Sequence, residues 1–260
     1  MTESQWRYAT ASVCGTSHIA TNTPCQDASE CCVVSNQKGE SVLIAIACDG
    51  AGSALRAEYG ASMTCRLITK AVKDFVHKEN SITGIKQENI EMWINNVCLT
   101  LDQQAIKENL SLRDFACTLI AAIISTKLAI FIQVGDGAIV IADSDTPDEF
   151  YWVFWPERGD YANTTSFITD PNFKTHLQFD YIEKQIKEVA ILTDGLQHLA
   201  LQYDSSSAYK PFFDGLFPPI RGINIEKMES MSNALATYLS SPKINQRTDD
   251  DKTLILATCR

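Results

Sequence analysis

The sequence contains no long hydrophobic run. None of its apolar stretches reaches the roughly 18–20 residues that a helix needs to cross a bilayer. The first ten residues, MTESQWRYAT, also lack the basic region and following apolar region of a secretory signal peptide. We therefore expect a cytoplasmic protein that neither crosses a membrane nor carries an export signal.

Histidine and paired cysteines are scarce as well. The chain has only four scattered histidines, and none of its nine cysteines forms a C-x-x-C pair. Zinc sites are built mainly from these groups, so a histidine-based zinc site is disfavoured. Several cysteines lie inside apolar segments, which predicts reduced, buried thiols rather than disulfides.

Positive charge is in deficit, with 22 Lys and Arg against 32 Asp and Glu and a formal net charge of −10. This balance argues against binding nucleic acid or an anionic membrane through bulk electrostatics, and it tolerates a bound cation. The hydrophobic fraction of 45% is ordinary for a globular protein, and 260 residues suffice for one large domain or two small ones.

Acidic residues stand at the ends of apolar runs. Three such runs end in Asp-Gly, and a fourth follows an acidic group: Ser41–Cys48 before Asp49, Leu128–Val134 before Asp136, Lys187–Thr193 before Asp194, and Thr253–Cys259 after Asp249–Asp251. Carboxylates held at the ends of buried strands suit hard cations such as Mg²⁺, Mn²⁺ or Ca²⁺. A metal-dependent enzyme is therefore the leading hypothesis.

Asp-Gly is also among the strongest hairpin signals. Asp136-Gly137 lies between two strand-like runs and by itself indicates a turn rather than a ligand. Asp49-Gly50 instead opens a glycine-rich loop, DGAGS, that leads into a helical pattern, and Asp194-Gly195 also precedes a helix-like segment. Asp249–Asp251 is also compatible with a solvated turn. Spacing alone leaves a shared site and separate turns as alternatives.

The order of predicted elements is α+β rather than alternating βαβ. Residues 209–222, which hold three of the eight prolines, are expected to be irregular. No internal repeat or low-complexity linker is present, so we expect one domain spanning residues 1–260. Helices are predicted around 61–75, 90–101 and 225–239, and strands at 6–13, 31–35, 41–48, 115–125, 128–134, 138–142, 150–155, 187–193 and 253–259.

Six short motifs follow one another through nearly the whole chain: Gly15–His18 with Cys25–Asp27, Asp49–Gly52, Ala116–Thr118, Val134–Gly137, Leu192–Gly195 and Asp250–Thr253. In this order and at these intervals they resemble the motifs of the metal-dependent Ser/Thr protein phosphatases of the PP2C (PPM) type. The segments GTSHIATNTPCQD and DGAGSALRAEYGA look most like a bacterial branch of that family.

The resemblance implies an α+β fold in which two antiparallel sheets pack as a sandwich with helices on both outer faces. It also implies a site for two Mn²⁺ or Mg²⁺ ions. By position, Asp49 would bridge the two ions and the Gly50 carbonyl would bind one. Asp194 and Asp250 would complete the second, and Asp27 would be a ligand directly or through water.

A third and weaker ion would be held by Asp136 together with Asp194. The implied reaction is attack on phosphorus by a metal-bridged water, without a covalent phosphoenzyme. Asp49 and Asp194 would then be catalytic through the ions that they hold.

The phosphate-binding residues depart from the family pattern. His18 stands where the family usually has an Arg, which makes it a candidate catalytic and substrate-binding residue, and Arg56 is a candidate to supply the missing charge. Alternatively, His18 is a polar residue at a strand end and Arg56 a solvated side chain. Gln26 replaces the commoner Glu, and Ala51 stands where some members carry a His proposed as general acid.

Residues 156–174 map to the region that often forms a flap beside the active site of these enzymes. Four side chains there are candidates for substrate contact: Glu157, Arg158, Tyr161 and Asn163. Exposed loop residues without such a role are the alternative.

The resemblance predicts hydrolysis of phosphoserine and phosphothreonine on proteins by a monomeric enzyme, opposed by a Ser/Thr kinase. One alternative is a catalytically weak or inactive PP2C-like module that binds a phosphoprotein partner. Another is a phosphatase of small phosphate esters, which the sequence does not separate from a protein phosphatase.

Overall fold

Strand β3 (Ser41–Cys48) shows why the chain folds into layers. Side chains alternate between the two faces of a strand, and both faces of β3 are buried, which explains its unbroken apolar sequence. One face packs on helices and the other on a second sheet: Val42, Ile44 and Ile46 toward the helices, and Leu43, Ala45 and Ala47 toward the sheet.

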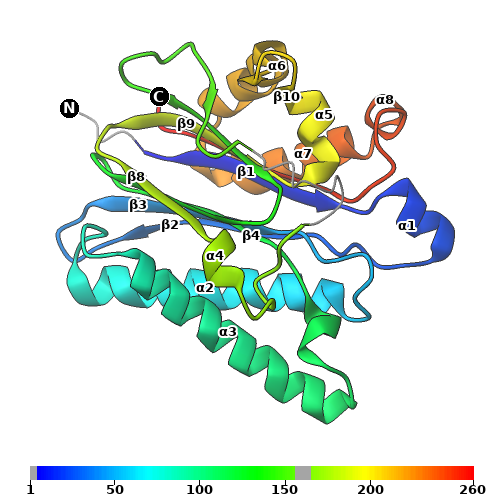
Figure 1. The fold of residues 1–260 in the computed structure, drawn as a ribbon. Coiled ribbons are helices and arrows are strands. Elements are labelled where there is room, and N and C mark those ends of the chain that lie inside the picture. Colours follow the sequence, from blue (N-terminus) through cyan, green and yellow to red (C-terminus); the bar gives the residue numbers. More distant parts are fainter. Residues whose placement is uncertain (1–4, 156–164) are drawn as a thin grey trace.

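The computed structural model describes residues 5–155 and 165–260, and these form two five-stranded antiparallel sheets (Figure 1). The first sheet has the order β1 (Arg7–Val13), β12 (Lys252–Thr258), β9 (Ile186–Leu192), β6 (Ala138–Asp143) and β7 (Tyr151–Trp152). The second has the order β2 (Ala28–Ser35), β3, β4 (Leu119–Ile124), β5 (Ala129–Val134) and β8 (Gln178–Ile182).

Helices cover the outer face of each sheet, which confirms the expected sandwich (Figure 1). The long helices α2 (Ala57–Glu79) and α3 (Gln87–Glu108) pack on the second sheet, and α6 (Lys210–Arg221) and α7 (Met228–Leu239) pack on the first. The shorter elements are α1 (Thr16–Thr21), η1 (Leu112–Phe115), α4 (Phe173–His176), η2 (Asp194–Leu196), α5 (Gln197–Ala200), β10 (Leu201–Gln202), β11 (Ser207–Ala208), η3 (Ile225–Lys227) and α8 (Pro242–Asn245).

Asp136-Gly137 does not close a hairpin, contrary to the turn that its sequence predicts. Strand β5 before it belongs to the second sheet, and strand β6 after it belongs to the first. The dipeptide therefore carries the chain from one sheet to the other. Gly135 allows the change of direction with φ of +112°, a backbone conformation that residues other than glycine rarely adopt.

The prediction of irregular structure over residues 209–222 is wrong, because helix α6 occupies most of this segment. Pro211 lies in the first helical turn, where its missing N–H would have no partner in the helix. Pro218 and Pro219 lie near the other end and cost hydrogen bonds. The buried side chains Phe213, Phe217 and Ile220 share one face of α6, so their packing outweighs this cost.

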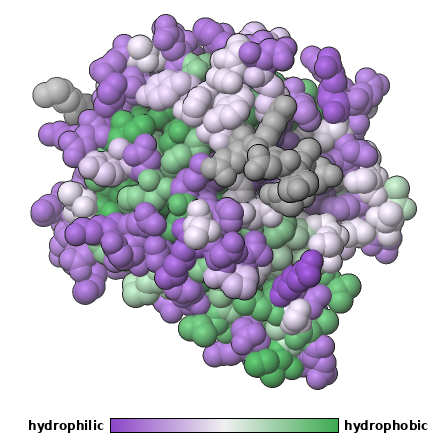
Figure 2. Space-filling model, viewed as in Figure 1, coloured by the Kyte–Doolittle hydropathy of each residue, from purple (hydrophilic) through white to green (hydrophobic). Residues whose placement is uncertain are grey.

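The surface is mixed in polarity. Figure 2 shows hydrophobic side chains gathered at the lower edge of the view, over the end of α3. Leu99 and Ile106 of that helix are 61% and 69% exposed. Among the described helices, none is both long enough and apolar enough to cross a membrane.

Candidate active site

The acidic strand ends predicted from the sequence meet at one end of the sandwich, where α1 lies (Figure 1). Antiparallel neighbours bring the end of one strand beside the start of the next. Here they surround a cavity of about 180 Å³. Its lining is His18, Gln26, Asp49, Gly50, Ala51, Gly52, Thr118, Asp136, Thr165, Phe167, Asp194, Asp250 and Asp251.

Asp49 is held by the start of the neighbouring strand. Its backbone N–H donates to the Thr118 hydroxyl at 2.9 Å, and its carbonyl accepts from the Thr118 N–H at 2.8 Å. The next residue, Gly50, forms a bridge with Cys117 and donates its N–H to the Gln26 carbonyl at 3.2 Å. The loop after β3 is therefore fixed on both sides, which positions the Asp49 carboxylate.

Asp27 and Asp194 come from different sheets and are linked through Thr193. The Thr193 hydroxyl donates to Asp27 Oδ2 at 2.8 Å, and the same hydroxyl oxygen accepts from the Thr253 N–H at 3.0 Å. Gly195 lies against the Asp251 backbone so closely that a Cβ at this position would overlap the Asp251 carbonyl oxygen. The Asp194-Gly195 dipeptide thus allows β9 and the residues before β12 to approach closely.

Asp251, rather than Asp250, connects the elements around the cavity. It is buried, and its Oδ1 accepts from the Gly15 N–H at 2.6 Å. Its Oδ2 accepts from the Gln26 N–H at 2.6 Å and lies 2.9 Å from His18 Nδ1. Asp250 is exposed and lines the cavity, and its Oδ1 accepts from the Asp251 N–H at 2.8 Å. Within the acidic trio, Asp251 is therefore the structural residue, and Asp250 keeps a carboxylate oxygen for a ligand.

His18 lies in helix α1 and not at a strand end. Its bond to Asp251 fixes the orientation of the imidazole beside the cavity. Asp136 also lines the cavity, where the Thr165 hydroxyl donates to its Oδ2 at 2.5 Å. The Gln197 side-chain amide donates to the Asp136 carbonyl, which ties the crossover between the sheets to α5.

The clustered carboxylates resist ionisation. Burial raises the pKa of Asp27 to about 8. Hydrogen bonds from Thr193 and Thr253 lower this pKa, and repulsion from Asp251 and Asp194 raises it further. Burial, followed by repulsion from Asp27 and Asp194, raises the pKa of Asp49 well above its ordinary value. Burial, followed by repulsion from Asp136, raises that of Asp194 to about 6. A bound cation would relieve this repulsion.

The donor set fits hard divalent cations. Asp27 Oδ1 and Gln26 Oε1 are buried oxygens without a hydrogen-bond partner, and a buried polar atom without a partner is costly. Together with the carboxylates of Asp49, Asp136, Asp194 and Asp250, they offer only oxygen ligands, which Mg²⁺ and Mn²⁺ prefer. The family resemblance implies such ions, and these residues are suited to hold them.

A softer group lies beside this set. Ligand atoms of Cys14, His18 and Asp251 lie within 4.8 Å of one another. However, His18 and Asp251 already bond to each other, and burial raises the pKa of the Cys14 thiol, which disfavours the thiolate that binds metals. The oxygen set is therefore the better cation site.

Not every candidate residue lines the cavity. Asp27 is not among its described lining residues, although the preceding residue Gln26 is. Arg56 does not line it; its guanidinium pairs with Glu58 at 3.1 Å and with Glu108 at 2.7 Å. Among the described lining residues there is no Lys or Arg. The flap candidates Glu157, Arg158, Tyr161 and Asn163 lie outside the described residues.

Several residues of the site were missed from the sequence. Asp251, Thr118 and Thr193 each position a cavity element through hydrogen bonds, and Thr165 bonds to Asp136. Thr118 and Thr193 lie inside or next to the recognised motifs, which was an available signal. Thr165 lies in a polar loop, outside the family motifs and without a hydrophobic period.

A family sequence profile described as "Protein phosphatase 2C" matches residues 14–240. The chain is 34% identical over 256 residues to "Serine/threonine-protein phosphatase 3" of Escherichia coli (strain K12). That alignment covers 97% of this chain and 98% of the relative. The profile match includes Asp27, Asp49, Asp136 and Asp194 and ends before Asp249–Asp251.

Solved structures of low sequence identity share the fold. A bacterial serine phosphatase matches with a TM-score of 0.60 at 16% identity, covering 98% of both chains. The Ser/Thr phosphatase Stp1 from Staphylococcus aureus matches with a TM-score of 0.57 at 18% identity, covering 98% of this chain and 95% of that one. PppA of Pseudomonas aeruginosa matches with a TM-score of 0.62 at 14% identity, covering 97% of each.

Proposed function

The chain belongs to the protein phosphatase 2C family of Ser/Thr protein phosphatases, and from this premise we propose that its acidic cavity is a two-cation active site for phosphoserine and phosphothreonine hydrolysis. The observation that carries the proposal is the convergence of Asp49, Asp194 and Asp250 from three strand ends on one cavity. Asp27 lies next to the lining residue Gln26, is bonded to Thr193 and keeps one buried oxygen without a partner. A weaker third site would use Asp136 with Asp194. The ions would be Mn²⁺ or Mg²⁺.

Divalent cations bound there would polarise a water that attacks phosphorus in line, so that no covalent phosphoenzyme forms. The protein's own contribution is to hold the ligand residues in place. Asp49 is fixed through Thr118, and Asp27 is fixed through Thr193. The Gly50 carbonyl would add a neutral ligand. The imidazolium form of His18, with its Nδ1–H held by Asp251, would donate its second N–H to the substrate phosphate.

The leaving alkoxide needs a proton. Ala51 provides no acidic group at the position where some family members carry a His, so water in the open cavity would supply that proton. We therefore expect the enzyme to cleave activated aryl phosphates more readily than alkyl phosphates.

One observation favours a second candidate, a weak or inactive module that binds a phosphoprotein. The described lining of the cavity has no Arg or Lys to hold phosphate, and His18 offers fewer donors than Arg. The full set of acidic residues supports the enzyme instead, because a module without catalysis has no use for these mutually repelling carboxylates.

The test compares the wild type with Asp49→Asn, and with Asp102→Asn as a control that makes the same chemical change at an exposed position on α3. Both an aryl phosphate and a phosphothreonine peptide are assayed with Mn²⁺ and with a chelator. We expect Mn²⁺-dependent hydrolysis of both substrates, unchanged in Asp102→Asn and reduced about 100-fold or more in Asp49→Asn.

The other possible outcomes separate the alternative functions. Undiminished activity in Asp49→Asn contradicts the role of that residue. A wild-type protein that binds Mn²⁺ but hydrolyses neither substrate is the non-catalytic module. Hydrolysis of the aryl phosphate alone indicates a phosphatase of small phosphate esters.

The physiological setting follows from the same proposal. The substrates would be phosphorylated proteins, made by a Ser/Thr kinase that opposes this enzyme. We propose a monomer that acts in the cytoplasm, without binding nucleic acid or membrane. The net charge of −10 is consistent with this choice of partners.

A further inference from the structure

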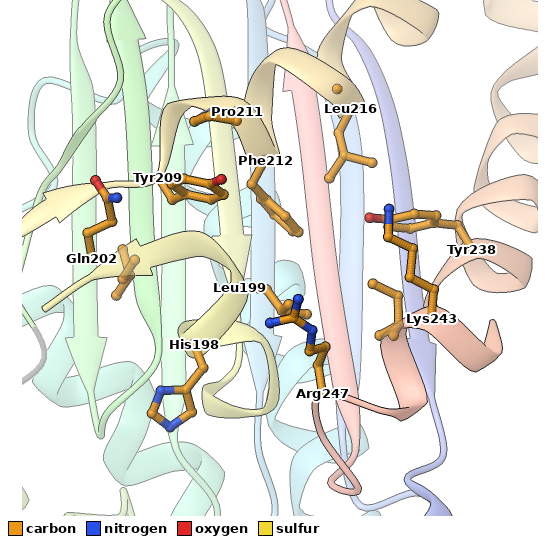
Figure 3. Close-up of a pocket in the computed structure, with 13 residues that line it drawn as sticks. His198, Leu199, Gln202, Tyr209, Pro211, Phe212, Leu216, Tyr238, Lys243 and Arg247 are labelled. Carbon is orange, nitrogen blue, oxygen red and sulfur yellow. The ribbon is translucent and has the colours of Figure 1, made fainter.

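A second and larger cavity, of about 690 Å³, opens on the helical side of the first sheet (Figure 3). Its walls come from α5, β10, α6, α7 and α8, and Arg247 follows α8. We call it the basic groove. Its lining is His198, Leu199, Leu201, Gln202, Tyr209, Pro211, Phe212, Gly215, Leu216, Tyr238, Lys243, Ile244 and Arg247.

The basic groove combines an apolar floor with a cationic rim. Leu201 and Ile244 are buried, and Leu199, Phe212 and Leu216 are half-buried beside them. In Figure 3 the Arg247 guanidinium extends toward Leu199, and Lys243 rises beside Tyr238. Among the described residues of the lining there is no Asp or Glu.

The two cations of the rim have no local counter-ion among the described residues. Lys243 and Arg247 are exposed, and neither forms an ion pair with a described residue. Some other exposed cations are neutralised locally, for example Lys210 by Asp214 at 2.8 Å and Lys174 by Glu91 at 2.9 Å. In a protein of net charge −10, an unpaired basic rim over an apolar floor is complementary to an acidic and apolar segment.

The basic groove shares two chain segments with the acidic cavity. Arg247 precedes Asp250 by three residues, which span about 11 Å at full extension. On the other side, α5 begins directly after the Asp194–Leu196 turn, and its Gln197 bonds to Asp136 while the next residue, His198, lines the basic groove. A peptide whose phosphorylated residue lies in the acidic cavity therefore needs only a short extension to reach the basic groove.

We propose that the basic groove docks a segment of the phosphoprotein substrate that carries acidic and large apolar side chains near the phosphorylated residue. This rests on the proposed function. The apolar side chains of the segment occupy the floor made by Leu199, Phe212 and Leu216, and its carboxylates pair with Lys243 and Arg247. Such docking adds substrate affinity that the acidic cavity, which lacks Lys and Arg among its described lining residues, does not supply.

The experiment uses phosphothreonine peptides with one common core. Extensions of alternating Leu and Glu, or of alternating Leu and Lys, are placed on either side of the phosphothreonine. The KM of each is measured with the wild type, with Lys243→Glu, and with Lys127→Glu as a control. Lys127 is an exposed lysine in the β4–β5 turn without a described ion pair, so both variants change the net charge equally.

We expect the Leu/Glu extension on one side to lower KM at least five-fold relative to the Leu/Lys extension in the wild type and in Lys127→Glu. Lys243→Glu should remove this preference and leave hydrolysis of an aryl phosphate unchanged, because that substrate is too small to reach the basic groove. Equal KM values for all extensions, with the core peptide still hydrolysed, would overturn the docking site and leave the phosphatase intact.

A direct binding measurement separates this inference from the proposed function. Fluorescence anisotropy of a labelled, unphosphorylated Leu/Glu peptide requires no catalysis. Binding by the wild type that is lost in Lys243→Glu supports the docking site even if the protein is inactive. Absence of binding, or self-association of the chain that Lys243→Glu abolishes, contradicts it.

Discussion

Asp251 accepts hydrogen bonds from two backbone N–H groups, those of Gly15 and Gln26, and also bonds to His18. Gly15 precedes α1, His18 lies in it and Gln26 follows it, so one carboxylate joins the first motif of the chain to the last. An acid that accepts several hydrogen bonds in a buried position has little capacity left for a metal ion. Asp250 is the better ligand candidate, as the family resemblance predicts.

Substitution of Asp251 by Asn tests this division. The amide nitrogen of Asn cannot accept a hydrogen bond, so at least one buried N–H loses its partner. We expect Asp251→Asn to lower the free energy of unfolding by about 1–3 kcal/mol in urea denaturation. Asp249→Asn, an exposed change in the same trio, should be close to neutral; equal losses in the two variants would show that Asp251 has no anchoring role.

Gly195 and Gly52, both in the family motifs, differ in the space that a side chain would have. A Cβ at Gly195 would overlap the Asp251 carbonyl oxygen, whereas a Cβ at Gly52 would meet no atom within 4 Å. We therefore expect Gly195→Ala to lower the free energy of unfolding by about 1–3 kcal/mol. Gly52→Ala should change it by less than about 0.5 kcal/mol. Thermal unfolding of the pair measures the difference, and a Gly195→Ala protein as stable as the wild type would contradict the close approach.

At the scale of elements, the edge of the first sheet is tied by a buried carboxylate. Asp143 at the end of β6 is 2% exposed, and it accepts hydrogen bonds from the Tyr151 hydroxyl at 2.7 Å and from Lys184 at 3.1 Å. The N–H groups of Asp145 and Thr146 also donate to it. Burial opposes its ionisation, but these hydrogen bonds outweigh burial and hold the pKa of Asp143 well below its ordinary value.

This shift gives a pH-dependent prediction. Because the pKa of Asp143 is lower in the folded chain than in the unfolded one, its contribution to stability is complete above about pH 4–5 and is lost as the pH falls below that range. We expect Asp143→Asn to destabilise by about 1–3 kcal/mol at pH 7. The difference from the wild type should shrink in unfolding measured near pH 3. A difference that is independent of pH would contradict the role of the charge.

The sequence predicted most elements because most are apolar on a regular period. The hairpin of β2 and β3, the helices α2 and α3, and the strands β5, β6, β9 and β12 all lie close to their predicted positions. Helix α6 was missed because its prolines suggested a break, although Phe213, Phe217 and Ile220 carried a helical period. Strand β8 was missed because it is a short edge strand whose residues do not alternate between buried and exposed.

At the scale of the whole molecule, the pairing of strands was harder to predict than the strands themselves. Asp136-Gly137 was predicted as a turn because the strands beside it are adjacent in sequence, but they belong to different sheets. Local pattern carries no information about which sheet a strand joins. The apolar runs pointed to Asp49, Asp136 and Asp194, and the family motifs then supplied the long-range information that added Asp27 and singled out Asp250. Asp251, Thr165 and the basic groove depend on contacts between distant segments.

The convergence of carboxylates also affects the stability of the whole fold. In the absence of cations, Asp27, Asp49 and Asp194 are held close together at one end of the sandwich, where burial and mutual repulsion oppose their ionisation. Ions that bind only the folded state stabilise it by about 2.7 kcal/mol at 100 times their Kd. We therefore expect Mn²⁺ to raise the Tm by several degrees, and a monovalent salt of equal ionic strength to have a much smaller effect.

The effect of Asp49→Asn on the Tm should have opposite signs with a chelator and with Mn²⁺. With a chelator present, the substitution removes one of the repelling carboxylates, so the Tm should equal or exceed that of the wild type. With Mn²⁺ present, the substitution removes a ligand, so the Tm should fall below that of the wild type. Asp102→Asn, on the exposed face of α3, should follow the wild type in both conditions. If Asp49→Asn instead shifts the Tm by the same amount with and without Mn²⁺, Asp49 is a structural residue, because only a ligand couples its effect on folding to the presence of the ion.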